Sequence, residues 1–203
     1  IGIPLSQQEI PRRTTGHVCV KAPVFPFIKL RGLDPAPGPE MKSTGEVFGS
    51  DVRADLAYLK ARLATEVPVA TEGGAYLTVR DEDKKDLIPI AQSLVDLDFT
   101  IYATLGTADV LRKANIPVTT SYRIAERMHP DSLDLMRKGD VSFIVNVPTI
   151  SGGAVRDGNM MRRLAVELNI PFVTTMRGAV MEVAAMKAGL ENDLEPRHLE
   201  VHY

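Results

Sequence analysis

The segment 99–111, FTIYATLGTADVL, is the part of the chain that most narrows the choice of fold. Its first half alternates β-branched and aromatic residues as a buried strand does, and its second half is a turn that opens a short helix. Thr104, Gly106 and Thr107 lie at the junction. Hydroxyls and a glycine at such a turn let free backbone N–H groups approach an anion, which predicts a phosphate-binding turn. The alternative interpretation is that they are ordinary capping and turn residues.

The composition is that of an ordinary globular protein. With 203 residues, 44% hydrophobic and 25% charged, the chain has room for one large domain or, as we favour, one domain and a fragment of another. A net charge of −2 gives no electrostatic reason to bind nucleic acid, and no basic run suggests a membrane partner. Apolar stretches such as 141–147 are far shorter than the roughly 20 residues of a membrane span. We therefore expect a cytoplasmic protein.

The cysteine and histidine content argues against disulfides and metals. A single cysteine, Cys19, allows no internal disulfide and fits a reducing compartment, and its apolar surroundings predict burial in a strand. No Cys or His cluster has metal-ligand spacing, so no metal site is predicted. The chain begins with Ile1 rather than Met, which suggests a piece of a longer protein.

The first third of the chain lacks the pattern of an independent domain. Residues 1–50 are rich in Pro and Gly, and only 16–21 resembles a strand. A helix is expected from Asp51, its N-cap, to Glu66, with an apolar stripe of Val52, Leu56, Leu59 and Leu63. The run VPVATEGGA that follows has the composition of a linker. We therefore divide the chain into 1–50, a connecting helix and linker at 51–70, a main domain at 71–190 and a tail at 191–203.

The main domain alternates strands with helices. Strands are expected at 75–79, 99–103, 116–120, 142–147 and 172–175. Pro89 should kink the helix that Asp81 or Asp83 caps, or delay its start. Further helices are expected at 108–114, at 131–138, around the inward residues Met161, Leu164, Ala165 and Leu168, and at 178–187. The pattern predicts an α/β fold with a five-stranded parallel, doubly wound sheet.

Polar residues follow the ends of these strands. A parallel sheet binds ligands at the carboxyl ends of its strands, where the strand order reverses. Two cations with several hydroxyls and an amide suit a phosphorylated ligand, because the cations neutralise phosphate and the neutral groups supply hydrogen bonds. The candidates are Thr78, Lys84, Thr104, Thr107, Arg123 and Asn146.

The residues resemble a known family. The segment 20–49, VKAPVFPFIKLRGLDPAPGPEMKSTGEVFG, is similar to the end of the second ATP-grasp half of the carbamoyl-phosphate synthase large subunit. The runs YLTVRDEDKKDL, ATLGTADVL, FIVNVP and RRLAVELNIPFVTT resemble the carboxy-terminal allosteric domain of that subunit, which has the methylglyoxal synthase fold. The resemblance covers almost the whole chain.

This resemblance implies part of an enzyme without its catalytic centre. The family makes carbamoyl phosphate from bicarbonate, glutamine-derived ammonia and ATP, for pyrimidines and arginine, and uses magnesium and potassium. Its ATP-grasp catalytic motifs lie upstream of this segment. The segment alone is therefore expected to be inactive, to hold no cofactor, and to work with the rest of the large subunit and a small glutaminase subunit.

The resemblance also implies regulation. The allosteric domain of the family binds a nucleotide such as UMP or IMP, and the matching positions are the six candidates given above. Arg123 stands where better-known members have Lys, and Pro148 stands where they have a nucleotide-contacting threonine. Ornithine activates some members through carboxylates that are replaced here by Ala22 and Val173, so no ornithine response is expected.

Two other functions stay open. A free-standing methylglyoxal synthase would need an Asp base after a Gly-Gly pair, but the corresponding run is YRIAERMHPD, in which only Glu126, His129 and Asp131 could take part. A docking domain that binds no ligand is the other alternative. A dinucleotide-binding module fits less well, because no GxGxxG follows the first strand of the main domain.

Overall fold

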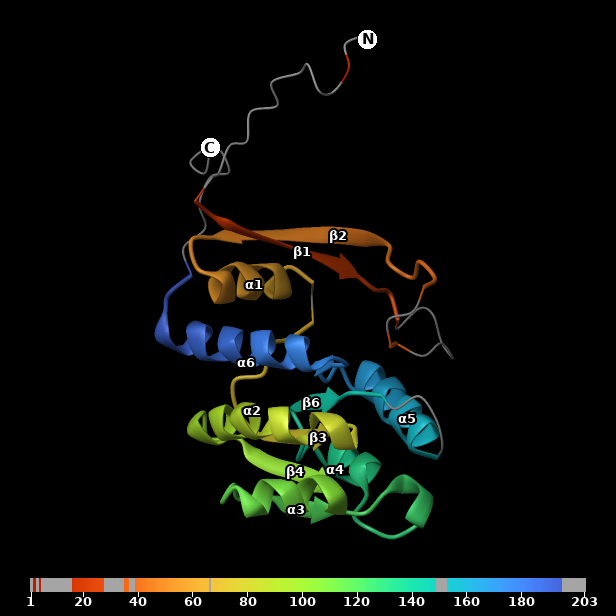
Figure 1. The fold of residues 1–203 in the computed structure, drawn as a ribbon. Coiled ribbons are helices and arrows are strands. Elements are labelled where there is room, and N and C mark those ends of the chain that lie inside the picture. The colour runs from red at the N-terminus through yellow and green to blue at the C-terminus, as the bar shows by residue number, and fades with distance from the viewer. Residues whose placement is uncertain are drawn as a thin grey trace.

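The computed structural model describes residues 2, 4, 16–27, 35, 36, 39–65, 67–148 and 153–194. These residues form a two-stranded sheet with one helix beneath it, followed by a larger α/β unit (Figure 1). The expected tail at 191–203 lies mostly outside the described residues.

A five-stranded parallel sheet forms the centre of the α/β unit, as the sequence predicted. Its strands, in spatial order, are β5 (Thr119–Ser121), β4 (Thr100–Thr104), β3 (Gly74–Thr78), β6 (Phe143–Asn146) and β7 (Phe172–Val173). The chain runs outward from β3 through β4 to β5, and then returns to the other side of β3 for β6 and β7. The order of the strands therefore reverses beside β3.

Helices cover both faces of this sheet and define two cores. One face carries α2 (Lys84–Asp96), α3 (Leu105–Lys113) and α6 (Met176–Glu191), which pack on the inward side chains of β3 and β6 such as Leu77 and Val145. The other face carries α4 (Ser132–Lys138) and α5 (Gly153–Glu167), which pack on Tyr76 and Ile144. Neighbouring residues of one strand thus enter opposite cores, and β6 is buried on both faces.

Several helix boundaries differ from the predicted ones, including that of α6 (Met176–Glu191), which was expected at 178–187. A 3₁₀ turn, η2 (Asp81–Asp83), leads into α2, which begins at Lys84 and continues through Pro89, so the delayed start is wrong. Helix α3 begins three residues before the expected Ala108. In α5, Met161 and Ala165 are buried, but Leu168 lies beyond the last helical residue and is 43% exposed.

The N-terminal part contains two strands, of which only the first was predicted. β1 (Val18–Val24) overlaps the expected strand at 16–21 and pairs antiparallel with β2 (Gly45–Asp51), which the sequence did not predict. Gly45 and Gly49 disfavour a helix in this stretch, and the structure has a strand there. Gly49 is the point where α1 (Ala54–Leu63) crosses the sheet, because a Cβ at Gly49 would lie 2.2 Å from the Ala57 carbonyl oxygen. Cys19 is exposed on β1, so its predicted burial is wrong.

The apolar face of α1 matches the predicted stripe at Leu59 but not at Val52 or Leu63. Asp51 ends β2, and the N-cap is Arg53. The buried residues are Ala57, Leu59 and Ala61, whereas Val52 is 64% exposed and Leu63 51% exposed. Small side chains face inward because β2 approaches closely on one side and α6 on the other (Figure 1). Glu66, the expected end of the helix, lies outside the described residues.

An ion pair with little exposure to solvent joins α1 to α6. The Arg62 Nε atom lies 2.9 Å from Oε2 of Glu182, and Tyr58 donates its hydroxyl proton to the same oxygen at 2.9 Å. The Glu182 side chain is 0% exposed and that of Arg62 is 15% exposed. Burial raises the pKa of Tyr58, and the Glu182 carboxylate raises it further. These interactions connect α1, and with it the β1–β2 sheet, to the α/β unit.

Candidate functional site

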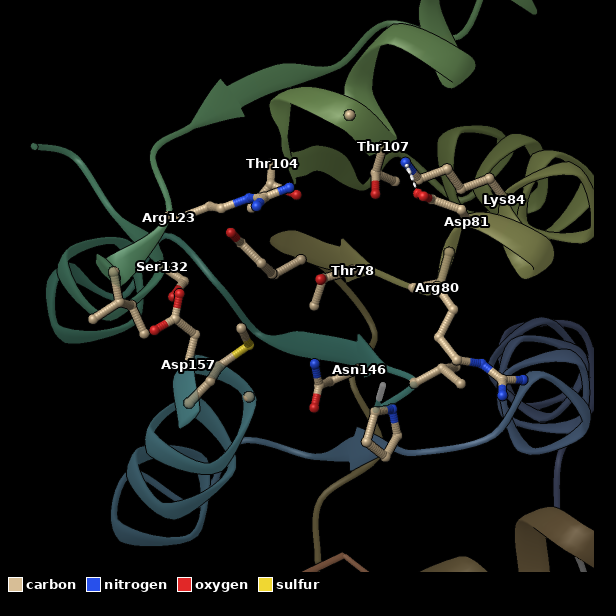
Figure 2. A pocket seen from close by; sticks show the side chains of 18 residues that line it. Thr78, Arg80, Asp81, Lys84, Thr104, Thr107, Arg123, Ser132, Asn146 and Asp157 are labelled. Atoms are coloured by element: carbon tan, nitrogen blue, oxygen red, sulfur yellow. Dashed lines mark ion pairs between the residues drawn. The ribbon is translucent and has the colours of Figure 1, made fainter. Parts of the chain in front are cut away.

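All six predicted site residues line one cavity of about 230 Å³ at the carboxyl ends of β3, β4, β5 and β6 (Figure 2). We call it the strand-end cavity. Thr78 and Asn146 end β3 and β6 and are register partners, and Thr104 ends β4. Because the chain moves away from β3 in both directions, no crossover helix fills the space above these ends.

The N-terminus of α3 opens onto the cavity without a side-chain cap. Thr104 is the N-cap in an extended conformation, and its hydroxyl makes no capping hydrogen bond. In contrast, Asp131 caps α4 by accepting hydrogen bonds from two backbone N–H groups, and Thr175 caps α6. The first-turn N–H groups of α3 have no intrahelical acceptor, so this helix start suits an anion. Thr107, in the same turn, is 2% exposed.

Two cations approach the cavity from opposite sides, Lys84 from α2 and Arg123 from the segment after β5 (Figure 2). The Lys84 Nζ atom lies 2.6 Å from Oδ1 of Asp81, and this hydrogen bond and charge lower the pKa of Asp81. A Cβ at Gly106 would lie 3.0 Å from the Lys84 ammonium, so the glycine leaves the lysine room at the start of α3. Arg80, by contrast, is directed away from the cavity centre in Figure 2 and pairs with Asp83.

Hydroxyl groups bond to one another at the floor of the cavity. The Tyr76 hydroxyl lies 2.8 Å from the Ser121 hydroxyl, and burial raises the pKa of Tyr76 to about 12. Ser132, at the start of α4, lies beside them and is 2% exposed. The floor is therefore polar but uncharged at neutral pH.

Buried polar groups also hold the β6 side of the cavity. Asn146 is 5% exposed, and its Oδ1 atom accepts a hydrogen bond from the guanidinium of Arg162 on α5. Asp157, on the same helix as Arg162, lines the cavity and accepts a hydrogen bond from the Ala125 backbone N–H at 3.3 Å. That bond ties α5 to η3 (Ile124–Glu126), the turn that carries Arg123.

Sequence reasoning missed several residues of the cavity. Asp81 was considered only as a helix cap, although it pairs with Lys84 within one turn. Three further lining residues, Tyr76, Ser132 and Asp157, come from a strand interior or from helices. Arg162 on α5 does not line the cavity but bonds to Asn146, which does. No local sequence pattern distinguishes these residues from core or surface residues. Only the packing of α4 and α5 against the sheet brings them to the strand ends.

The residues suggested for a lyase do not line the strand-end cavity. Asp131 caps α4, and Glu126 accepts a hydrogen bond from the Arg123 backbone N–H. His129, Asp131 and Asp134 place one potential metal-ligand atom each within 4.8 Å of one another, a cluster that sequence spacing did not indicate. Their oxygens, however, accept capping hydrogen bonds, and Asp134 pairs with His129 at 2.5 Å. These carboxylates therefore have structural partners.

A second cavity, of about 370 Å³, lies between β1 and α1 on one side and α5, β7 and α6 on the other. We call it the hairpin cavity. Ala22 and Val173, the positions that the resemblance linked to ornithine, both line it. Among its described lining residues the one carboxylate is Glu182, which already bonds to Arg62 and Tyr58.

The α/β unit is similar in sequence to an MGS-like domain. The model of that domain family matches residues 86–174, from α2 to the end of β7, and so includes most of the cavity. Within the described residues, no helix has both the length and the apolar character that crossing a membrane requires.

Relatives extend the similarity to most of the chain and confirm the resemblance inferred from the sequence. The chain is 44% identical, over 91% of its length, to the carbamoyl phosphate synthase large chain, C-terminal section, of Methanocaldococcus jannaschii, and covers 30% of it. Its identity to the same section of Methanopyrus kandleri is 42%, over 88% of this chain and 33% of that protein. With the large chain of Halomonas eurihalina it shares 40% identity over 98% of its length, but spans only 18% of that relative. The chain thus corresponds to a minor part of these proteins.

Proposed function

We propose that the chain is the C-terminal regulatory part of a carbamoyl phosphate synthase large chain, and that its strand-end cavity binds a nucleotide effector of the UMP or IMP class. The observation that carries this proposal is the convergence of Lys84, Arg123 and the uncapped start of α3 on one cavity. Relatives named as the large chain, with 36% to 44% identity, supply the context.

The geometry suggests how an effector would be held. A phosphate at the start of α3 would accept hydrogen bonds from backbone N–H groups and from the Thr104 and Thr107 hydroxyls. Lys84 would exchange its partner Asp81 for the phosphate, and Arg123 would close the other side. Thr78 and Asn146, across the cavity, would then meet the nucleoside (Figure 2).

The remaining assignments follow from the resemblance. We propose that residues 1–50 are the end of an ATP-grasp domain, 51–70 the connecting segment, 71–190 the effector domain and 191–203 a tail. Synthesis of carbamoyl phosphate, with its ATP, magnesium and potassium, would belong to the intact cytoplasmic enzyme and its small glutaminase subunit, for pyrimidine and arginine formation. The segment alone would be catalytically inactive.

We also propose that ornithine does not act through the hairpin cavity. Ala22 and Val173 offer no charge, and an ammonium group would have to compete with Arg62 for the Glu182 carboxylate. Burial of an unpaired ammonium is unfavourable. Calorimetric titration of the intact enzyme with ornithine is expected to show no binding, and micromolar binding that is lost on blocking this cavity would refute the proposal.

Calorimetric titration of the 203-residue chain with UMP and with IMP tests the effector proposal. Saturable binding is expected, and the double variant Lys84→Ala, Thr107→Val should abolish it. Lys138→Ala is the matched control, because Lys138 also pairs with a nearby carboxylate, that of Asp140, but lies outside the strand-end cavity. No binding of either nucleotide to the wild-type chain would refute the proposal and favour a docking domain.

The lyase alternative has a separate test. The carboxylates that line the strand-end cavity are Asp81, which pairs with Lys84, and Asp157, which accepts an N–H. Neither lies in the run 122–131 after the third strand of the main domain, where a methylglyoxal synthase would carry its Asp base behind a Gly-Gly pair. Incubation with dihydroxyacetone phosphate is therefore expected to yield no methylglyoxal, and its formation at a rate that Asp157→Asn abolishes would overturn the regulatory assignment.

A further inference from the structure

We propose that Arg162 is a positioning residue that fixes Asn146 as a hydrogen-bond donor toward the strand-end cavity, so that the site prefers nucleotides whose base carries a keto oxygen over those with an amino group at the same place. The inference rests on the proposed function and adds the chemical preference of the site. It starts from a buried side-chain pair on the β6 side of the cavity, opposite the phosphate-binding turn.

The chemistry of arginine determines which way the Asn146 amide faces. A guanidinium has only donors, so the Asn146 atom that it contacts has to be the acceptor Oδ1. The NH₂ group is then left on the other side, and Figure 2 shows that nitrogen directed toward Thr78 and the middle of the cavity. A flipped amide would place two donors face to face. Arg162 therefore makes Asn146 a donor to the ligand.

Burial makes this orientation a fixed property of the site. Arg162 is 2% exposed and Asn146 5% exposed, so water does not replace their hydrogen bond readily. Asn146 is also held by the ladder between β3 and β6, where it is the register partner of Thr78. Both the backbone and the side chain of Asn146 are thus constrained before a ligand arrives.

Gly158 gives the pair the space that it needs. A Cβ at this position would lie 2.9 Å from Nη1 of Arg162 and 3.2 Å from Oδ1 of Asn146. Gly158 lies on the same face of α5 as Arg162, one turn earlier, so the guanidinium and the amide pack against bare helix backbone. Any larger residue at position 158 would displace the hydrogen-bonded atoms themselves.

The sheet geometry places Asn146 near the base rather than the phosphate. The phosphate-binding turn follows β4, whereas Asn146 ends β6, and β3 lies between these strands. Two strand spacings amount to about 10 Å, which is of the order of the distance from phosphate to base in a nucleotide. Uracil and hypoxanthine present a keto oxygen where cytosine and adenine present an amino donor. A fixed Asn146 donor suits the first two bases.

The test is calorimetric titration of the full 203-residue chain with UMP, CMP, IMP and AMP. The wild-type chain is expected to bind UMP over CMP, and IMP over AMP, by about tenfold, the effect of one hydrogen bond to the base. In Arg162→Met the amide is free to turn, so both ratios should fall toward one. Arg163→Met is the matched control, because Arg163 is an exposed neighbour on the same helix. It should leave both ratios unchanged.

Two further variants keep the inference testable if Arg162→Met does not fold. In Asn146→Asp, one oxygen pairs with Arg162 and the other presents only an acceptor, so CMP and AMP should now bind better than UMP and IMP. Arg162→Lys, which keeps a charged donor, should retain part of the preference. Thermal unfolding of each variant shows which ones are folded.

The outcomes distinguish failure of the Arg162 inference from failure of the proposed effector site. If every nucleotide weakens by the same factor in Arg162→Met, Arg162 is only structural and the inference is wrong. Equal binding of keto and amino nucleotides by the wild-type chain also refutes it, although the effector site itself would stand. If none of the four nucleotides binds to the wild-type chain, the proposed function and the inference both fail.

Discussion

The buried ion pair between α1 and α6 allows a quantitative prediction. Replacing Arg62 by Met leaves the Glu182 carboxylate, which is 0% exposed, with Tyr58 as its remaining described partner. Removing one partner of a buried pair costs about 3–5 kcal/mol, because the other charge stays in a medium that solvates it poorly. We therefore expect Arg62→Met to lower the free energy of unfolding by that amount. Tyr58→Phe, which removes one hydrogen bond to a charged acceptor, should cost about 1.5–3 kcal/mol.

The double variant and a control separate this effect from loss of packing. In Arg62→Met, Glu182→Leu no charge remains buried, so most of the lost stability should return. Lys138→Met breaks an exposed pair in which the Lys138 side chain is 75% exposed, and should leave the free energy of unfolding almost unchanged. Urea unfolding, followed by circular dichroism, measures each value. A loss below about 1 kcal/mol in Arg62→Met would show that Glu182 is not a buried charge and would refute the reasoning.

Three further predictions concern pH and backbone geometry. The Asp134 carboxylate raises the pKa of His129 above its ordinary 6.5, so the pair stabilises the fold fully below pH 6.5 and loses its effect as the pH rises through the higher folded-state value. An NMR titration of the His129 ring should show the raised pKa, and in Asp134→Asn the pKa of His129 should return toward its ordinary value. Gly49→Ala should cost about 1–3 kcal/mol in urea unfolding, and Gly45→Ala, in open space, almost nothing. Pro89→Ala should stabilise α2 by about 2 kcal/mol, which thermal unfolding measures.

For each of these three predictions, on His129, Gly49 and Pro89, one result would contradict the reasoning. A His129 midpoint at 6.5 in the wild-type chain would mean that Asp134 does not interact with the imidazole. Equal stability of the Gly49 and Gly45 variants would show that α1 does not approach β2 as closely as described. A Pro89→Ala variant no more stable than the wild type would indicate that α2 accommodates the proline without loss.

The α/β architecture could be predicted because its local signals agree. Strands β3, β4 and β6 are apolar, α4 is closed by Asp131 and Gly139, and short connections join them. Strand β2 was not predicted, because its glycines weaken the strand pattern and the reason for Gly49 is the close approach of α1, which is a tertiary contact. The inward face of α1 was predicted correctly only at Leu59. Close packing on both sides places Ala57 and Ala61 beside it, whereas the sequence pattern favoured the larger Val52 and Leu63.

The strand-end cavity was predictable where its residues follow strands. Thr78, Thr104 and Asn146 each end a strand, so a parallel sheet brings them to one edge whatever the details of packing. Asp157 and Arg162 lie on α5, and their contribution depends on how that helix rotates against the sheet. Such a rotation is a tertiary property, and a single sequence contains no local signal for it.

The strand order also determines when a refolding chain acquires its cavity. In the sequence, only α2 separates β3 from β4, whereas α2, β4, α3, β5 and α4 all lie between β3 and β6. The pairing of β6 with β3 therefore closes a longer loop than the pairing of β4 with β3. Lys84 and Thr107 are in place with the first pairing, but Asn146 arrives only with the second. If the proposed effector binds there, its affinity during refolding reports the docking of β6, and the bound effector should slow unfolding by holding the two halves of the sheet together.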